Sequence, residues 1–150
     1  MTIEAFETKS VRMERVFAVR VLAPEEDVDR IMEHVCQIVP LKQGAYDSNA
    51  WQSAPGVERY RPLEGAAAGV ETEVRKRPGV VEVSFELPLD QSLLEQVIEK
   101  IYEVHSYQEQ TIKVHEMLVS RTKGRDDKAN PYRWWNTTGD WKKKQATKQP

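Results

Sequence analysis

Apolar residues alternate with polar ones in several short segments of the chain, which is the period of a strand with one buried face. The clearest segment is 80–87, where Val81, Val83 and Phe85 are separated by polar residues. Phe17, Val19 and Val21 alternate in the same way within 15–22. Further strands are predicted over 45–52, 57–61, 71–77 and 111–119, with turns at 53–56 and 78–79.

Two other segments repeat their apolar residues every three or four positions, which is typical of a helix with one buried stripe. The stripes are Val28, Ile31, Met32, Val35 and Val39 in the first helix, and Leu94, Val97, Ile98, Ile101 and Val104 in the second. Pro24 and the acidic residues after it favour the start of the first helix, and Pro40 ends that helix. Asp90 is predicted to cap the second helix, which ends near His105.

The predicted order is therefore strand, helix, strand, strand, helix, strand. Two such halves with right-handed crossovers form a ferredoxin-like split βαβ sandwich, an α+β fold in which both helices cover one face of an antiparallel sheet. Residues 13–119 are predicted to form this domain. Residues 1–12 lack a clear period and are predicted to be an N-terminal extension, and residues 120–150 a basic, tryptophan-containing C-terminal tail.

Composition and charge add to this picture. The charged fraction of 31% and the absence of a long apolar run predict a soluble protein with no membrane span and no signal peptide. The one cysteine, Cys36, excludes an internal disulfide and zinc-finger spacing, which favours the cytoplasm. Residues 120–150 carry nine basic and three acidic residues, so the other 119 residues hold a net charge of -8. A basic tail on an acidic body predicts an interaction with an anionic or neighbouring acidic surface.

Two motifs carry a resemblance to a known family. The first reads Gly44-x-Tyr46, then Trp51 and Gly56, then Tyr60-Arg61-Pro62-Leu63-Glu64-Gly65-Ala66; the second reads His105-x-Tyr107-x-Glu109. Over about residues 13–119 the chain resembles the CutA-like, PII-like YqfO domain, which occurs alone and as an insert in Nif-three-like (NGG-one-interacting factor) proteins. CutA divalent-cation-tolerance proteins have a related His-Pro-Tyr-Glu stretch.

The resemblance implies the same sandwich and a tendency to form homotrimers. The candidate ligand-binding residues are Tyr46, Arg61, Glu64, Gly65, His105, Tyr107 and Glu109. The resemblance does not imply the dinuclear-metal hydrolase chemistry of the larger proteins, because those ligands lie outside this domain. The chain also departs from the family pattern at Ser106, Gln108, Gln110 and Ala67-Ala68.

Arg61, Glu64 and Gly65 have two interpretations. They could clamp an anion or small ligand, because arginine offers a fixed fork of donors and glycine permits close backbone approach. The commoner arrangement, which we favour, is an Arg61–Glu64 ion pair that fixes a bend, with Gly65 at an unusual φ.

His105, Tyr107 and Glu109 also have two interpretations. His105 could ligate a divalent metal with the other two in support, but one histidine and one carboxylate are too few for a tight site in one chain. A subunit boundary could complete the site. We favour a structural imidazole at the C-terminal end of the second helix, and we expect Cys36 to be a buried, inert thiol.

Trp134, Trp135 and Trp141, with Lys142 to Lys144, could bind nucleic acid, but we favour hydrophobic anchors for the tail because the body is acidic. No catalytic motif is present, so we do not expect an enzyme or a cofactor other than a divalent metal. The sequence predicts a non-catalytic PII/CutA-like oligomeric domain that binds a small ligand, metal ion or protein partner in regulation. The alternatives are CutA-like metal homeostasis, and an interaction module whose tail captures an anionic partner.

Overall fold

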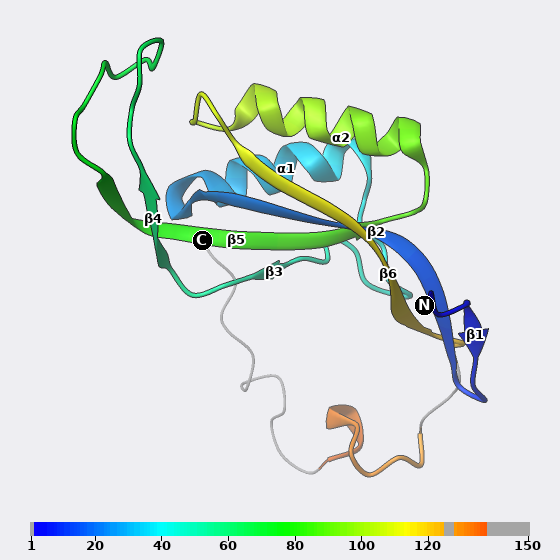
Figure 1. Ribbon diagram of the computed structural model, residues 1–150. Helices are drawn as coiled ribbons and strands as arrows, with labels where there is room; N and C mark the ends of the chain where they lie inside the picture. Colours follow the sequence, from blue (N-terminus) through cyan, green and yellow to red (C-terminus); the bar gives the residue numbers. More distant parts are fainter. Residues whose placement is uncertain (1, 125–127, 138–150) are drawn as a thin grey trace.

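The computed structural model describes residues 2–124 and 128–137 (Figure 1). Its strands are β1 (Phe6–Glu7), β2 (Val11–Pro24), β3 (Trp51–Gln52), β4 (Gly56–Tyr60), β5 (Arg75–Leu87) and β6 (Thr111–Thr122). Its helices are α1 (Val28–Ile38) and α2 (Gln91–Val104), with 3-10 turns at Glu25–Asp27 and Trp134–Asn136.

The strands form one antiparallel sheet with β2 and β5 at its centre. β6 pairs with the outer side of β2, whereas β3 and β4 pair with different stretches of β5. Both helices lie on the same face of the sheet (Figure 1). The order β2, α1, β4, β5, α2, β6 gives the predicted ferredoxin-like arrangement, which is therefore confirmed.

The hydrophobic core lies between the sheet and the two helices. The fully buried side chains with the largest volumes are Phe85, Ile31, Leu87, Ile101, Val19, Val21, Val35, Val81, Val83 and Val97. These residues come from the predicted strand and helix patterns, so the covered face of the sheet is the face predicted. Asp90 accepts a hydrogen bond from the backbone N–H of Leu93, which confirms it as the N-cap of α2.

The predicted turn at Pro78 and Gly79 is wrong, because β5 continues through it. The pairing of β4 with β5 shifts between Gly56 and Glu58, so Pro78 and Gly79 lie opposite the single residue Val57. Gly79 has a φ of +76° there. An irregularity of this kind accommodates both the missing N–H of proline and the left-handed glycine without ending the strand.

The predicted strand over 45–52 is mostly wrong, since only Trp51–Gln52 is extended and paired. Ser48 has a φ of +56°, which is incompatible with a strand. The side chain of Asn49 donates hydrogen bonds to the carbonyls of Leu41 and Tyr46, and holds the segment as a loop. Asparagine favours such local bonds over a strand ladder.

The ends of the domain are more ordered than the sequence predicts. β2 begins at Val11 rather than at 15, and β6 continues to Thr122, which pairs with Val11. Part of the predicted extension forms β1, which pairs with β2. The division into 1–12, 13–119 and 120–150 stays a prediction. Trp141 and Lys142 to Lys144 lie outside the described residues. No helix in the described part of the chain is long and apolar enough to cross a membrane.

Candidate functional site

The two sequence motifs meet at one end of the sheet, through the loop after α2. Asp27, at the start of α1, is buried with 3% of its surface exposed. Its carboxylate accepts hydrogen bonds from the backbone N–H of Ser106, at 3.0 Å, and from the Ser106 hydroxyl, at 2.5 Å. Arg30 forms an ion pair with the other oxygen at 2.7 Å, and donates to the carbonyl of Val104. One buried carboxylate thus ties the start of α1 to the end of α2.

Burial alone would raise the pKa of Asp27. The hydrogen bonds from Ser106 and Arg30, together with the positive charge of Arg30, outweigh burial and lower the pKa below its ordinary value of 3.8. Asp27 is therefore a structural carboxylate that stays ionised. It is not a proton donor near neutral pH.

His105 is also buried, and both of its ring nitrogens are hydrogen-bonded. Nε2 lies 2.8 Å from the carbonyl of Leu22, so it carries the proton, and Nδ1 accepts the backbone N–H of Tyr107 at 3.0 Å. The imidazole joins the end of β2 to the loop after α2. This geometry fits the structural role that we favoured, because neither nitrogen has a free lone pair for a metal ion.

No group of three or more histidine, cysteine, aspartate or glutamate side chains gathers as a metal site among residues 2–124 and 128–137. The metal role of His105 stays a prediction, and a calorimetric titration with Zn²⁺ and Cu²⁺ tests it. Micromolar binding that His105→Gln abolishes would establish the role, whereas binding unchanged by the substitution would remove it.

Gln108 connects the second motif to the first. Its side-chain oxygen accepts the backbone N–H of Ala67 at 2.8 Å, and its side-chain nitrogen donates to the carbonyl of Gly65 at 3.1 Å. An amide can accept and donate at once, whereas the glutamate of the family pattern could only accept when ionised. The departure at Gln108 therefore gives this chain a two-point clamp on the loop that follows β4.

Tyr107 lies beneath this clamp, next to His105, with their ring centroids 4.9 Å apart. The guanidinium of Arg77 lies over its ring, 5.2 Å from the centroid. The Tyr107 hydroxyl is buried, and its interaction with the carboxylate of Glu58 falls short of a well-formed hydrogen bond. Burial, followed by the nearby carboxylate of Glu58, raises the pKa of Tyr107 to about 12, so the phenol stays protonated.

The loop after β4 departs from our favoured interpretation in one respect. Gly65 has a φ of +94° at the third position of a turn closed by the Ala66 N–H and the Leu63 carbonyl, which confirms its unusual conformation. The expected Arg61–Glu64 ion pair is wrong: both side chains are exposed, and neither forms an ion pair with a described residue. The bend therefore depends on the conformation of Gly65 rather than on an ion pair of Arg61.

Tyr46 and Glu109 do not join the cluster. Tyr46 is exposed in the loop after α1, where its backbone bridges to Gln43. Glu109 is exposed next to the Gln108 clamp. Within the described residues, neither side chain forms a hydrogen bond, ion pair or ring contact with His105 or Tyr107. The structure therefore brings together His105, Tyr107 and the backbone of Gly65, and leaves the other candidates on the surface.

Sequence reasoning missed the importance of Asp27, Arg30 and Ser106. The only available signal was Asp27 three residues before Arg30, which places both on one side of a helix start. Cys36, which we expected to be buried, is half-buried and packs against the core, and its inertness stays a prediction.

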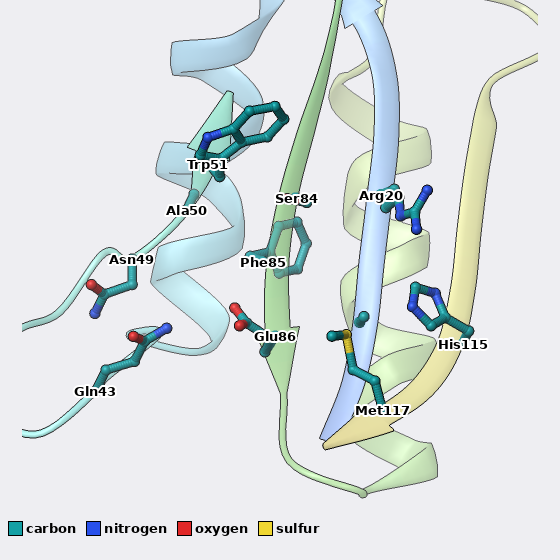
Figure 2. Close-up of a pocket in the computed structure, with 11 residues that line it drawn as sticks. Arg20, Gln43, Asn49, Ala50, Trp51, Ser84, Phe85, Glu86, His115 and Met117 are labelled. Carbon is teal, nitrogen blue, oxygen red and sulfur yellow. The ribbon is translucent and has the colours of Figure 1, made fainter. Parts of the chain in front are cut away.

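A second candidate surface lies on the face of the sheet away from the helices, which we call the open face. It contains a hollow of about 390 Å³ between the sheet and the loop before β3. Trp51 stands over one side of the hollow, and Arg20 and His115 lie across the sheet from it (Figure 2). Glu86 and Met117 also line it, so the surface is mixed in character.

Comparisons with solved structures bear on the fold. No family model and no curated protein matches the chain. A Bacillus cereus protein related to NIF3 is similar, with 20% identity and a TM-score of 0.58, over 73% of this chain and 28% of that protein. The periplasmic divalent cation tolerance protein CutA from Archaeoglobus fulgidus matches at 14% identity and a TM-score of 0.47, over 68% of this chain and 82% of CutA. B. subtilis GlnK matches at 14% identity and a TM-score of 0.45, over 69% of this chain and 86% of GlnK.

The chain shares its fold with the matched part of the NIF3-related protein. The resemblance to the domain found in Nif-three-like proteins is thus confirmed at the level of the fold. The chain spans about 28% of the length of the NIF3-related protein that it matches, so that protein's activity does not transfer with the fold.

Proposed function

We propose that this chain is a non-catalytic CutA/PII-like domain that forms a homotrimer and binds a small ligand, a metal ion or a protein partner in regulation. The observation that carries the proposal is the open face of the sheet. The helices cover only the opposite face, while Trp51 on β3 is 62% exposed beside the hollow. A second copy that covers this face would remove the indole from water.

Light scattering on the purified chain tests this proposal. A mass of three times 17.3 kDa at micromolar concentration is expected. Trp51→Asp should lower the mass to that of one chain, because a carboxylate buried in the contact would lack a partner. Tyr102→Asp is the matched control, since Tyr102 is equally exposed, at 58%, but lies on α2. A single-chain mass for the unmodified protein would refute the homotrimer.

We place the ligand-binding surface at the loop clamped by Gln108, with Arg61 as its cationic group. Arg61 has no ion-pair partner among the described residues, and the turn that follows it contains Gly65 at a positive φ. Citrate and inorganic phosphate serve as probe anions in an NMR titration. The amide shifts of residues 61–69 should move in the unmodified protein and much less in Arg61→Gln. Equal amide shifts in both proteins would show that Arg61 does not belong to the ligand-binding surface.

The proposed location is the cytoplasm, on the basis of the single cysteine and the absence of a disulfide requirement. The proposed partner is a second copy of the chain, and nucleic acid is not expected.

A further inference from the structure

The described part of the C-terminal tail forms a compact turn around Asn130. The side-chain oxygen of Asn130 accepts the backbone N–H of Tyr132 at 2.9 Å, and its carbonyl accepts the side-chain amide of Asn136 at 2.8 Å. Thr137 closes the other end by donating its hydroxyl and its backbone N–H to the carbonyl of Trp134. These bonds fix the backbone of 130–137, which we call the aromatic turn.

The aromatic turn exposes three large rings. Tyr132 is 87% exposed, Trp135 54% and Trp134 46%. Rings of this size supply most of the energy at protein interfaces when they become buried, and a turn that is already ordered loses little entropy on binding. The aromatic turn therefore has the properties of a binding segment that would bury its rings against another surface.

The open-face hollow has matching properties. Its volume of about 390 Å³ lies in the range of pockets that take a ligand-sized group. Trp51 and Met117 supply apolar surface, and a methionine sulfur packs favourably against an indole. In Figure 1 the aromatic turn, drawn in orange, lies on the side of the sheet away from the helices, which is the side of the hollow.

The charges also match. Residues 120–150 carry nine basic and three acidic residues, whereas the rest of the chain has a net charge of -8. Glu86 lines the hollow and forms no ion pair with any of residues 2–124 or 128–137. Arg20 lines the same hollow but is paired with Glu82 at 4.0 Å, so a basic segment approaching the open face would meet Glu86 as the unpaired charge.

We propose that the aromatic turn of one chain packs into the open-face hollow of a second copy. None of the described residues that line the hollow belongs to the turn, so the turn does not fill the hollow of its own chain. The contact is heterologous, because turn and hollow are different surfaces, and successive contacts of this kind form a ring when the rotation between copies closes, as the proposed homotrimer requires. The inference rests on the proposed self-association and names the segment that completes it.

The test uses the full chain and two substituted forms, with sedimentation equilibrium as the measurement. Trp134→Ser with Trp135→Ser removes two rings of the aromatic turn, and Glu86→Lys reverses the charge of the hollow. Each should weaken self-association at least tenfold while the circular dichroism spectrum of the folded chain stays unchanged, because none of the three residues is buried. Tyr102→Ser, on α2, should leave self-association unchanged. An equimolar mixture of the two weakened forms should associate more tightly than either alone, because each mixed pair keeps one intact turn facing one intact hollow.

Three outcomes would overturn the inference. If the double tryptophan variant associates as tightly as the unmodified chain, the homotrimer stands but the turn is not part of it. If the unmodified chain is monomeric and its indoles are accessible to acrylamide, both proposals fail. If the chain is monomeric and the indoles of Trp134 and Trp135 are shielded, the turn occupies its own hollow rather than that of a second copy.

Discussion

The two faces of the central sheet come from the same strands but have different surroundings. On the covered face, Val83 and Phe85 are fully buried beneath α1 and α2. On the open face, their neighbours Ser84 and Glu86 border a hollow, with Trp51 exposed beside it. Because side chains alternate along a strand, one element supplies the stability of the chain on one face and a surface for association on the other.

Phe85→Ala, on the covered face, should have the largest effect on stability of the substitutions considered. The substitution leaves a cavity in the core, and a loss of about 3–5 kcal/mol in the free energy of unfolding is expected. Urea denaturation measures this loss. Ser84→Ala, one residue away on the open face, should change the free energy of unfolding by less than about 0.5 kcal/mol. Similar losses for both substitutions would show that the open face is also packed in the single chain.

Asp27→Asn should have the next largest effect, since it weakens the joint between α1 and the end of α2. Loss of charged hydrogen bonds predicts a decrease of about 1.5–3 kcal/mol at neutral pH. The pKa of Asp27 is lowered on folding, so the unfolded chain binds more protons at acidic pH. The stabilisation by Asp27 is therefore present above the ordinary pKa of 3.8 and is lost as the pH falls through the pKa of the folded state.

Denaturation curves between neutral pH and acid measure this dependence. The unmodified chain should lose stability more steeply in acid than Asp27→Asn. Parallel curves would mean that the carboxylate of Asp27 is not differentially stabilised by folding. Asp29→Asn, an exposed acidic residue on the same helix, is the control and should follow the unmodified chain.

Gly65→Val should cost about 1–3 kcal/mol, because valine must adopt the positive φ of the turn after β4. An added Cβ meets no atom within 4 Å at this position, so the cost comes from backbone strain and not from a clash. Gly56→Val is the control, since Gly56 lies in β4 and its added Cβ would be at an ordinary 3.8 Å from the Val80 carbonyl. A melting curve unchanged by Gly65→Val would disprove the strain.

Gln108→Glu should have the smallest effect on stability, about 1 kcal/mol, because one exposed hydrogen bond to Gly65 is lost. Hydrogen exchange should accelerate at residues 65–69 and remain unchanged in the core. Glu109→Gln, at the adjacent exposed position, should alter neither. Unchanged exchange in Gln108→Glu would mean that the turn holds its conformation without the clamp.

The sequence by itself determined the fold class, the two helices and the buried side of β5. Those features follow from local periodicity, which repeats along each element and needs no partner to be recognised. The cap at Asp90 and the left-handed glycine at position 65 were also predictable, because both depend on residues close in the chain.

Only the tertiary structure decided the rest. The joint of Asp27 with Ser106 connects positions 79 residues apart, and Gln108 reaches Gly65 across 43. Whether Pro78 ends a strand depended on the irregular pairing with β4, and whether Arg61 pairs with Glu64 depended on the bend between them. Such contacts depend on how segments that are distant in the sequence pack together. A hydrogen bond contributes more to stability when it is buried, and burial is also set by packing, so residue type alone could not predict these contacts.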